Sequence, residues 1–226
     1  MAGRTALGLV FGTVLGMSEA EQLAAPARRF GWRDGARWFG IACLLAAAFL
    51  AGYVSWLLWG TGITTQRAQN ELRPQIEQEI ANPPRAGTPI LPGKAYAVIQ
   101  IPRIGVNMVV VQGVDTLDLE SGPGHYPDTA DPWDTKGRVG IAGHRTTYLH
   151  PFFDLNQVQP GDTITLQTAR GTFTYTVTKN FVLPADTAGV VLNQTKTPTL
   201  VLTTCNPRYS ASERLIVEAD RVSSAA

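Results

Sequence analysis

The sequence predicts an all-β domain, either a closed β-barrel or a sandwich, carried behind one N-terminal membrane-spanning helix. Three observations lead to this interpretation. One uncharged apolar run is long enough to cross a bilayer. The chain after residue 93 consists of short β-branched runs separated by turns containing Gly and Pro, which is typical of barrels and sandwiches. A length of 226 residues leaves room for one modest domain plus appendages.

The apolar run covers residues 38–59 and reads WFGIACLLAAAFLAGYVSWLLW. About 20 residues at ~1.5 Å rise cross a ~30 Å hydrocarbon core, and tryptophans at both ends suit the two interfaces. Arg28, Arg29, Arg33 and Arg37 lie within ten residues before the run, and the next basic residue after it is Arg67. The positive-inside rule therefore predicts a single-pass cell-membrane protein with residues 1–37 in the cytoplasm and the chain after Gly60 outside.

Two other interpretations of this run fit less well. A cleavable signal peptide has a shorter apolar region with a small-residue cleavage site behind it, whereas this run is long and ends in WLLWGTG. A lipid-modified Cys43 would require an apolar residue three positions earlier, where the chain has Gly40. A signal-anchor helix is therefore expected, with the lipid bilayer as its partner.

Residues 60–93 are predicted to form a stalk and a linker. The first part, up to residue 81, is polar with helical propensity and is interrupted by Pro74. The second part, NPPRAGTPILPG (82–93), is dense in Pro and Gly. The folded domain is expected to begin at Lys94 and to cover residues 94–226.

The domain shows strand signals in place of long helices. The predicted strands are residues 96–101, 106–112, 138–143, 162–167, 172–178, 199–204 and 214–219. Short helices are expected at 116–120 and 151–156. The two alternating runs around TARG (168–171) are typical of a hairpin.

Charge and cysteine content narrow the function classes. With 19 basic and 18 acidic residues, the chain has no excess of positive charge for binding nucleic acid. The chain has two cysteines, Cys43 in the apolar run and Cys205 in the domain. We expect Cys43 to lie in the bilayer and Cys205 outside it, so the two are predicted not to pair. A lone thiol outside the cell is exposed to oxidation, so retaining Cys205 indicates a use, with a small buried cysteine as the alternative.

A thiol nucleophile needs a lowered pKa or an adjacent base, and a cation stabilises the oxyanion that its attack creates. His144 follows the apolar strand RVGIAG, and Cys205 follows the apolar strand TLVLTT. Arg214 opens the next strand, after the loop NPRYSASE. If that loop is a hairpin connection, Arg214 returns beside Cys205, and all three side chains lie at strand ends.

The residues around these positions resemble the sortase family. TLVLTTCNPRYSASER (199–214) is similar to the sortase signature TLxTC, with an Arg nine residues after the Cys. VGIAGHRTTYLHPFFDLNQVQPGDTITL (139–166) resembles the segment around the sortase histidine. GPGHYPDTADP (122–132) resembles the preceding loop of class E, the housekeeping sortases of high-GC Gram-positive bacteria. The resemblance covers most of residues 95–220.

The resemblance implies a closed eight-stranded β-barrel with short helices and a cell-wall sorting reaction without a cofactor. Cys205 would cleave a sorting signal between Thr and Gly, and an amine of a peptidoglycan precursor would resolve the thioacyl enzyme. His144 would act as general acid and base, and Arg214 would stabilise the oxyanion. The implied partners are secreted proteins that carry a C-terminal sorting signal.

Two further residues follow from the likeness to class E, which is associated with LAxTG-like signals in place of LPxTG. Tyr126 matches the position linked to that preference, although a Tyr that merely packs over the barrel mouth is equally open. Thr204 would lie in the groove, where it would contact substrate or donate to the oxyanion. Thr203 is less well placed for this, since side chains alternate along a strand.

The remaining histidines and the aspartates favour no metal site. A zinc site of His125, His144 and His150 lacks any His–carboxylate pattern at metal spacing. Asp128, Asp131 and Asp134 recur every three residues, without the spacing and central Gly of a calcium loop. We therefore expect a solvated turn there and no metal.

Two alternatives to a housekeeping sortase stay open at this point. A class D or pilin-polymerising sortase would use the same three residues on a different signal. A non-catalytic, membrane-tethered β-domain that binds wall or partner proteins would merely bury its thiol.

Overall fold

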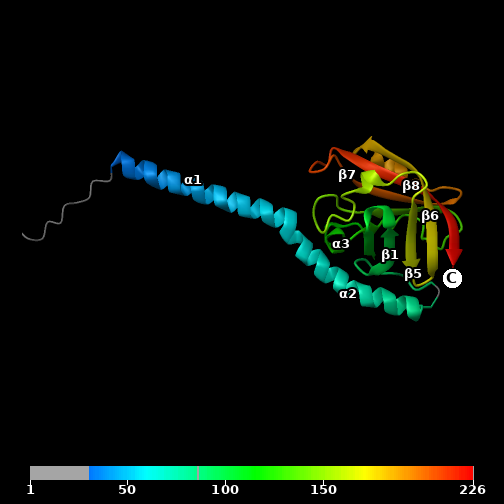
Figure 1. The fold of residues 1–226 in the computed structure, drawn as a ribbon. Coiled ribbons are helices and arrows are strands. Elements are labelled where there is room, and N and C mark those ends of the chain that lie inside the picture. The colour runs from blue at the N-terminus through cyan, green and yellow to red at the C-terminus, as the bar shows by residue number, and fades with distance from the viewer. Residues whose placement is uncertain (1–30, 86, 226) are drawn as a thin grey trace, which may run out of the picture. The chain divides into compact units, whose positions relative to one another are not determined.

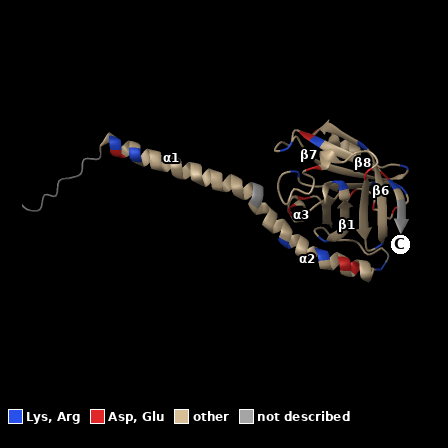
Figure 2. Ribbon diagram, viewed as in Figure 1, with Lys and Arg blue, Asp and Glu red and all other residues tan. Residues whose placement is uncertain are grey.

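The structure is a computed structural model that describes residues 31–85 and 87–225. The chain divides into two compact units, Met1–Ala48 and Phe49–Ala226. Helix α1 (Trp32–Ser55) is the one described helix long and apolar enough to span a membrane, with a mean hydropathy of 1.9. Its 24 residues give ~36 Å of rise, and its charged residues all lie near its start (Figure 2). The end of the predicted span, 56–59, forms the π-helical turn η2 (Trp56–Gly60) instead.

Most of the predicted cytoplasmic segment 1–37, including Arg28 and Arg29, lies outside the described residues. Arg33 and Arg37 are described and lie in the first part of α1. The orientation of the helix across a membrane therefore stays a prediction.

Helix α2 (Thr61–Ala81) packs on the domain, which differs from the stalk that we expected from residue 60 onward. Leu72 and Ile76 are buried in a cluster with residues of the first two strands. The buried positions of α2 recur every three or four residues, namely Thr61, Thr65, Gln69, Leu72 and Ile76. Three of them are polar, which explains why this face was not recognised in the sequence.

Gln69 shows how a polar face of α2 binds a strand. Its side-chain Nε2 donates to the carbonyl of Val109 at 2.9 Å, and its Oε1 accepts from the N–H of Val109 at 2.7 Å. The amide thus satisfies both backbone groups of a buried strand residue. The helix continues through Pro74 without a break.

The rest of the chain forms a closed barrel in the strand order β1-β2-β3-β4-β7-β8-β6-β5 (Figure 1). The strands are β1 (Ala95–Ile101), β2 (Val106–Gln112), β3 (Gly124–His125), β4 (Gly137–Ala142), β5 (Thr163–Thr168), β6 (Gly171–Pro184), β7 (Pro198–Asn206) and β8 (Glu213–Ala225). The short helices are η3 (Pro102–Ile104), α3 (Thr116–Ser121), η4 (Leu155–Gln157) and η5 (Ala188–Leu192). The all-β, eight-stranded closed barrel is confirmed.

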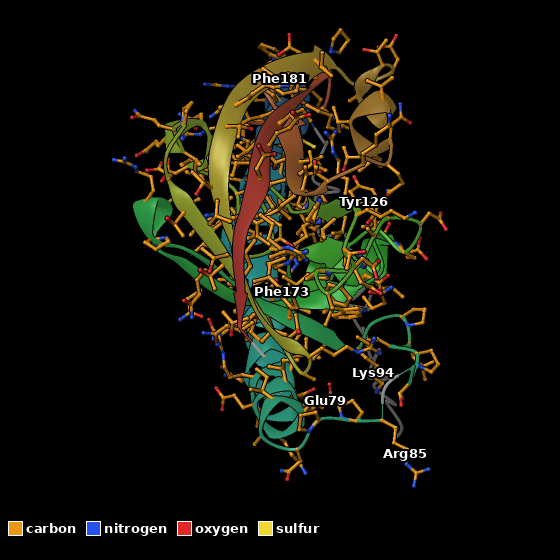
Figure 3. All side chains as sticks on the ribbon, turned by 90° about the vertical axis from the view of Figure 1, so that its right-hand side faces the viewer. Glu79, Arg85, Lys94, Tyr126, Phe173 and Phe181 are labelled. Carbon is orange, nitrogen blue, oxygen red and sulfur yellow. The ribbon has the colours of Figure 1, made fainter. Side chains whose placement is uncertain are left out.

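Two pairings in the barrel are parallel, β2 with β3 and β4 with β7, and the others are antiparallel. The predicted strands all occur, but two of them are longer than expected. β6 extends to Pro184, with Phe173 and Phe181 toward its two ends (Figure 3), and β8 extends to Ala225. The two-residue strand β3 was not predicted.

The alternation of side chains gives the barrel two packed faces. The interior is the main core, which contains Leu200 and Leu202 of β7. The outer face of the same strand holds Val201, which packs with Ile216 of β8 and Val191 of η5. Strands β7 and β8 are therefore covered on both sides in their central parts.

A polar network around His125 anchors the loop that follows β3. The imidazole is buried and stacks on Tyr96 at a centroid distance of 4.1 Å. Its Nδ1 lies 2.9 Å from Gln112 Oε1, and the Tyr96 hydroxyl donates to Asp131 at 2.7 Å. Burial lowers the pKa of His125 to about 4. His125 and Asp131, the latter one of the aspartates expected in a solvated turn, thus help to hold the loop.

The buried His125 predicts acid sensitivity of the fold. Its pKa lies below the ~6.5 of an unfolded histidine, so protonation favours the unfolded state. The contribution of the neutral His125 to the free energy of unfolding is complete above about pH 6.5. As the pH falls toward 4, this contribution, about 3 kcal/mol, is lost. Thermal unfolding across this range is expected to show a smaller acid loss in His125→Gln than in the wild type. Equal losses in both proteins would contradict this origin.

Candidate functional site

Of the three residues expected to act together, Cys205 and Arg214 lie on neighbouring strands, and His144 comes two residues after the end of a third strand, β4. Cys205 of β7 pairs directly with Arg214 of β8. Strand β4 runs parallel to β7 with Ala142 opposite Thr203, so two residues further on His144 comes alongside Cys205. A hydrogen bond from the Gly143 N–H to the Thr203 carbonyl at 3.1 Å extends this register. Since neighbouring strands are ~4.8 Å apart, continuing this register by two residues indicates that His144, Cys205 and Arg214 lie in one row at the end of the barrel.

The alternation of side chains also places the three residues on one face. Val201 of β7 and Ile216 of β8 belong to the outer cluster, so Cys205 and Arg214, at even spacing from them, face outward too. On β4, Ile141 belongs to the interior core, so His144 lies on the outer face as well. The Cys205 side chain is partly exposed.

His144 is partly buried, and one of its ring nitrogens has no partner among the described residues. Its Nε2 is buried and has no hydrogen-bond partner among the described residues. Burial lowers the pKa of His144, and the negative charge of Glu120 acts in the opposite direction. The imidazole also packs against the ring of Tyr148 at a centroid distance of 4.9 Å. A ring nitrogen without a partner, beside a thiol, is suited to exchange a proton with it.

The guanidinium of Arg214 is bound by its own loop. Its Nη1 donates to the carbonyls of Ala211 and Glu213, each at 2.9 Å. Within the described part of the chain, Nε and Nη2 of Arg214 make no hydrogen bond. These two N–H groups are therefore available to a ligand on the outer face, next to Cys205.

Arg145 is a residue of this site that the sequence analysis did not single out. It is 6% exposed, and it donates from Nη1 to the carbonyl of Cys205 at 3.1 Å and to the side chain of Asn206. Its Nη2 donates to Asn156 Oδ1 at 3.0 Å. Burial lowers the pKa of Arg145, as does the neighbouring charge of Arg208. In the sequence, the only feature that points to Arg145 as a site residue is its position directly after His144.

Tyr126 lies on the same face of β7 as Cys205. The hydroxyl of Tyr126, labelled in Figure 3, is 3.2 Å from Thr203 Oγ1. Thr203 comes two residues before Cys205 and therefore shares its face of the strand. Thr204 points to the opposite face, where its hydroxyl donates to the Gly143 carbonyl at 2.7 Å. The structure therefore puts Thr203 beside Tyr126, on the face of β7 that also carries Cys205. Thr204 instead ties β7 to Gly143, the residue before His144.

The three histidines do not come together. His125 is buried in the network beneath its loop, and His150 is exposed and packs against Phe153 at 5.2 Å between ring centroids. Among the described residues, no group of three or more His, Cys, Asp or Glu side chains is arranged to hold a metal ion.

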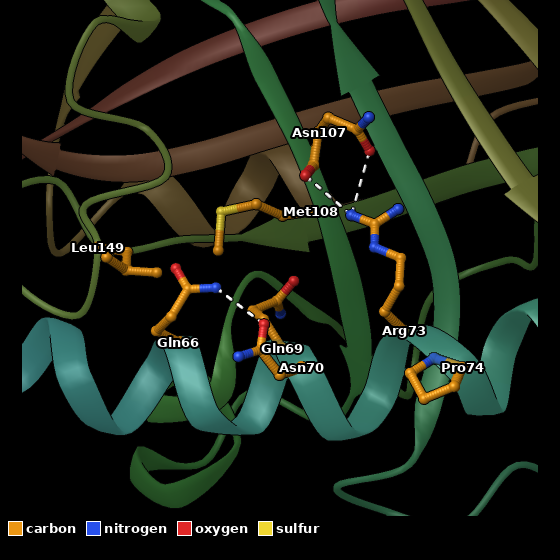
Figure 4. A pocket seen from close by; sticks show the side chains of 8 residues that line it. All are labelled: Gln66, Gln69, Asn70, Arg73, Pro74, Asn107, Met108 and Leu149. Atoms are coloured by element: carbon orange, nitrogen blue, oxygen red, sulfur yellow. Dashed lines mark hydrogen bonds between the residues drawn. The ribbon is translucent and has the colours of Figure 1, made fainter.

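Two adjacent grooves lie beside the loop that follows His144. One of about 360 Å³ runs between α2 and β2, and its lining includes Arg73, whose Nη2 donates to Asn107 (Figure 4). The second, of about 290 Å³, includes His150. They share Asn107, Met108 and Leu149, and neither is lined by His144, Cys205 or Arg214.

The sequence model of the sortase domain matches residues 99–222, more than half of the chain. The chain belongs to the sortase family. This sortase is 29% identical to sortase SrtE1 of Streptomyces coelicolor over 181 residues, which is 73% of this chain and 51% of the relative. It is 35% identical to sortase D of Bacillus subtilis over 133 residues, which is 58% of this chain and 65% of the relative. The sortase therefore spans between about half and two thirds of the lengths of these curated relatives.

Among solved structures, the sortase is similar to a Clostridium perfringens sortase D5 transpeptidase. The TM-score is 0.60 at 29% identity, and the likeness covers 71% of this chain and 99% of the other. The expected membership in the sortase family is thus confirmed. Relatives of both class D and class E resemble this sortase.

Proposed function

We propose that this sortase is a membrane-anchored cysteine transpeptidase with Cys205 as nucleophile and His144 and Arg214 as its partners. The observation that carries the proposal is the register of the barrel: Cys205 of β7 pairs with Arg214 of β8, and His144 follows the end of β4, the parallel neighbour of β7. His144 and Cys205 are 61 residues apart in the sequence, so their proximity depends on the fold. Helix α1 supports anchoring of the chain in a bilayer.

The reaction runs in two halves that use the same groups. In the first half, the Cys205 thiol gives its proton to His144, and the sulfur attacks the Thr carbonyl of the sorting signal. The N–H groups of Arg214 stabilise the negative oxygen of the tetrahedral intermediate. His144 then returns the proton to the leaving amine of Gly, which departs as the C–N bond breaks and a thioester remains on Cys205.

In the second half, an amine takes the place of the departed Gly segment. His144 accepts a proton from this amine as its nitrogen attacks the thioester carbonyl. The C–S bond then breaks, an amide bond forms to the acceptor, and Cys205 recovers its proton. With a peptidoglycan precursor amine as the acceptor, the product is a secreted protein bound to the cell wall outside the membrane.

For the class, we propose a housekeeping sortase of class E that acts on LAxTG-like signals, with LPxTG as the competing signal. The position of Tyr126 against Thr203, on the Cys205 face, supports a role of this tyrosine in contacting the signal. Similarity to sortase D and sortase D5 favours class D as the second candidate. Both candidates use the same three residues and differ in the signal they cleave.

The proposal is tested with the full-length protein in nanodiscs and quenched fluorescent peptides that contain LAxTG or LPxTG, with and without an added amine. We expect cleavage between Thr and Gly, a thioester on Cys205 by mass spectrometry, and preference for LAxTG. Cys205→Ala and Arg214→Ala are expected to remove cleavage, whereas the matched control Cys43→Ala, in α1, retains it. Preference for LPxTG would contradict class E, and an uncleaved peptide with an unreactive Cys205 would favour the non-catalytic domain.

A further inference from the structure

The loop that follows His144 has an unusual backbone. Tyr148, Leu149 and His150 are three consecutive non-glycine residues with positive φ, at 54°, 57° and 37°. The left-handed region is disfavoured for L-residues, and such conformations persist only where surrounding contacts hold them. The contacts that hold this loop therefore determine where its side chains lie.

Two helices supply these contacts. The N–H of Tyr148 donates to Thr61 Oγ1 of α2 at 3.2 Å, and the hydroxyl of Tyr148 donates to Glu120 Oε1 of α3 at 2.9 Å. Thr65 of α2 in turn donates to the carbonyl of Glu120 at 2.7 Å. Both ends of Tyr148 are thus bound, and Glu120 is bound to α2 through its backbone.

The ring of Tyr148 contacts the imidazole of His144, with 4.9 Å between centroids and an angle of 33° between the planes. Among the described residues, the buried Nε2 of His144 has no polar partner of its own that would orient the ring. A ring held at its hydroxyl end and packed against an imidazole restricts the rotamers available to that imidazole. The carboxylate of Glu120 accepts the hydrogen bond from the hydroxyl of this tyrosine.

We propose that Tyr148 and Glu120 are positioning residues for His144: Tyr148 orients the imidazole beside Cys205, and Glu120 holds Tyr148 and places a negative charge near the histidine. The inference rests on the proposed function for the role of His144. Glu120 from α3 acts on the charge of His144, Tyr148 from its own loop packs on the ring, and the proposed function adds Cys205 of β7 and Arg214 of β8. Helix α2 contributes neutral hydroxyls, with Thr61 bound to the loop and Thr65 bound to Glu120.

Two conservative variants separate the parts of this arrangement. Glu120→Gln keeps an oxygen that accepts from Tyr148 but removes the charge. Tyr148→Phe keeps the ring that packs on His144 but loses the hydrogen bond to Glu120. The matched controls are Glu77→Gln, at an exposed position of α2, and Tyr175→Phe, whose buried hydroxyl has no partner among the described residues.

The first readout is the titration of His144 in the full-length protein in nanodiscs, followed by NMR of ¹³C-labelled histidine and assigned with His144→Gln. Glu120→Gln is expected to lower the pKa of His144 further, because the charge that opposed the effect of burial is gone. Glu77→Gln is expected to leave the titration unchanged. An unchanged titration in Glu120→Gln would overturn the inference.

The second readout is the kinetics of peptide cleavage. Tyr148→Phe is expected to lower kcat by about 10-fold with KM within about 2-fold of the wild type, because an interaction made in the transition state is lost. Tyr175→Phe is expected to leave both constants unchanged. A KM effect alone, or no effect, would overturn the role of Tyr148. If the wild type cleaves no peptide but Glu120→Gln still shifts the titration, the proposed function fails while the arrangement around His144 stands.

Discussion

His144→Ala is expected to lower kcat/KM for peptide cleavage by about 10³-fold or more, because the proposed reaction uses the same imidazole as base for Cys205 and as acid for the leaving amine. The histidine follows the end of β4, the parallel neighbour of β7, and its buried Nε2 has no partner among the described residues. The measurement is initial-rate kinetics with the full-length protein in nanodiscs, with the thermal midpoint recorded in parallel.

The matched control for this variant is His150→Ala. His150 lies six residues further on, in the same loop, but it is exposed and packs against Phe153. Its replacement is expected to change kcat/KM by less than about 3-fold, as for a surface residue away from the chemistry. Similar losses in the two variants would mean that the loop, and not the imidazole of His144, is what the reaction needs.

Arg145→Met is expected to lower both stability and activity. The guanidinium is buried and donates to the carbonyl of Cys205 and to the side chains of Asn206 and Asn156. Methionine fills a similar volume but removes the donor to the Cys205 carbonyl and to Asn206, at about 1–3 kcal/mol for each buried group, whereas the exposed Asn156 keeps a donor in Arg208. We expect a net loss of about 3 kcal/mol, which corresponds to a thermal midpoint lower by about 6–12 °C.

The activity of Arg145→Met is expected to fall by about 10-fold or more at a temperature where the variant is folded, because the carbonyl of the nucleophile residue loses its fixed position. Arg103→Met is the matched control. Arg103 also makes a two-pronged contact, to Asp162, but its side chain is 47% exposed, and such surface pairs contribute about 0–1 kcal/mol. An Arg145 variant as stable and active as the Arg103 variant would contradict the role given to the buried guanidinium.

The strands were predictable because their residues alternate or form β-branched runs, and that pattern is local. Strand β3 was missed because Gly124 and His125 are too few to show any alternation. Helix α2 was mistaken for a stalk because half of its contact with the barrel is polar, as the amide of Gln69 on Val109 illustrates. A helix that binds a strand through hydrogen bonds leaves only a weak apolar signal in the sequence.

At the site, the order and spacing of His144, Cys205 and Arg214 predict that these residues group together, and β7 and β8 pair Cys205 with Arg214. The place of His144 beside them stays a prediction. The face of Thr204 was not predictable, because it depends on which side of β7 meets the core. A strand packed on both faces carries apolar residues at every position, and its sequence does not tell inside from outside.

The sequence by itself determined the family, the β-rich domain, the apolar helix before it and the three residues expected to carry the chemistry. These all follow from local patterns or from motifs with fixed spacing. Only the tertiary structure shows the contacts of Glu120, Tyr148 and Arg145. Glu120 and Tyr148 are 28 residues apart, and Arg145 lies 60 and 61 residues from Cys205 and Asn206, so no local pattern in the sequence encodes these contacts.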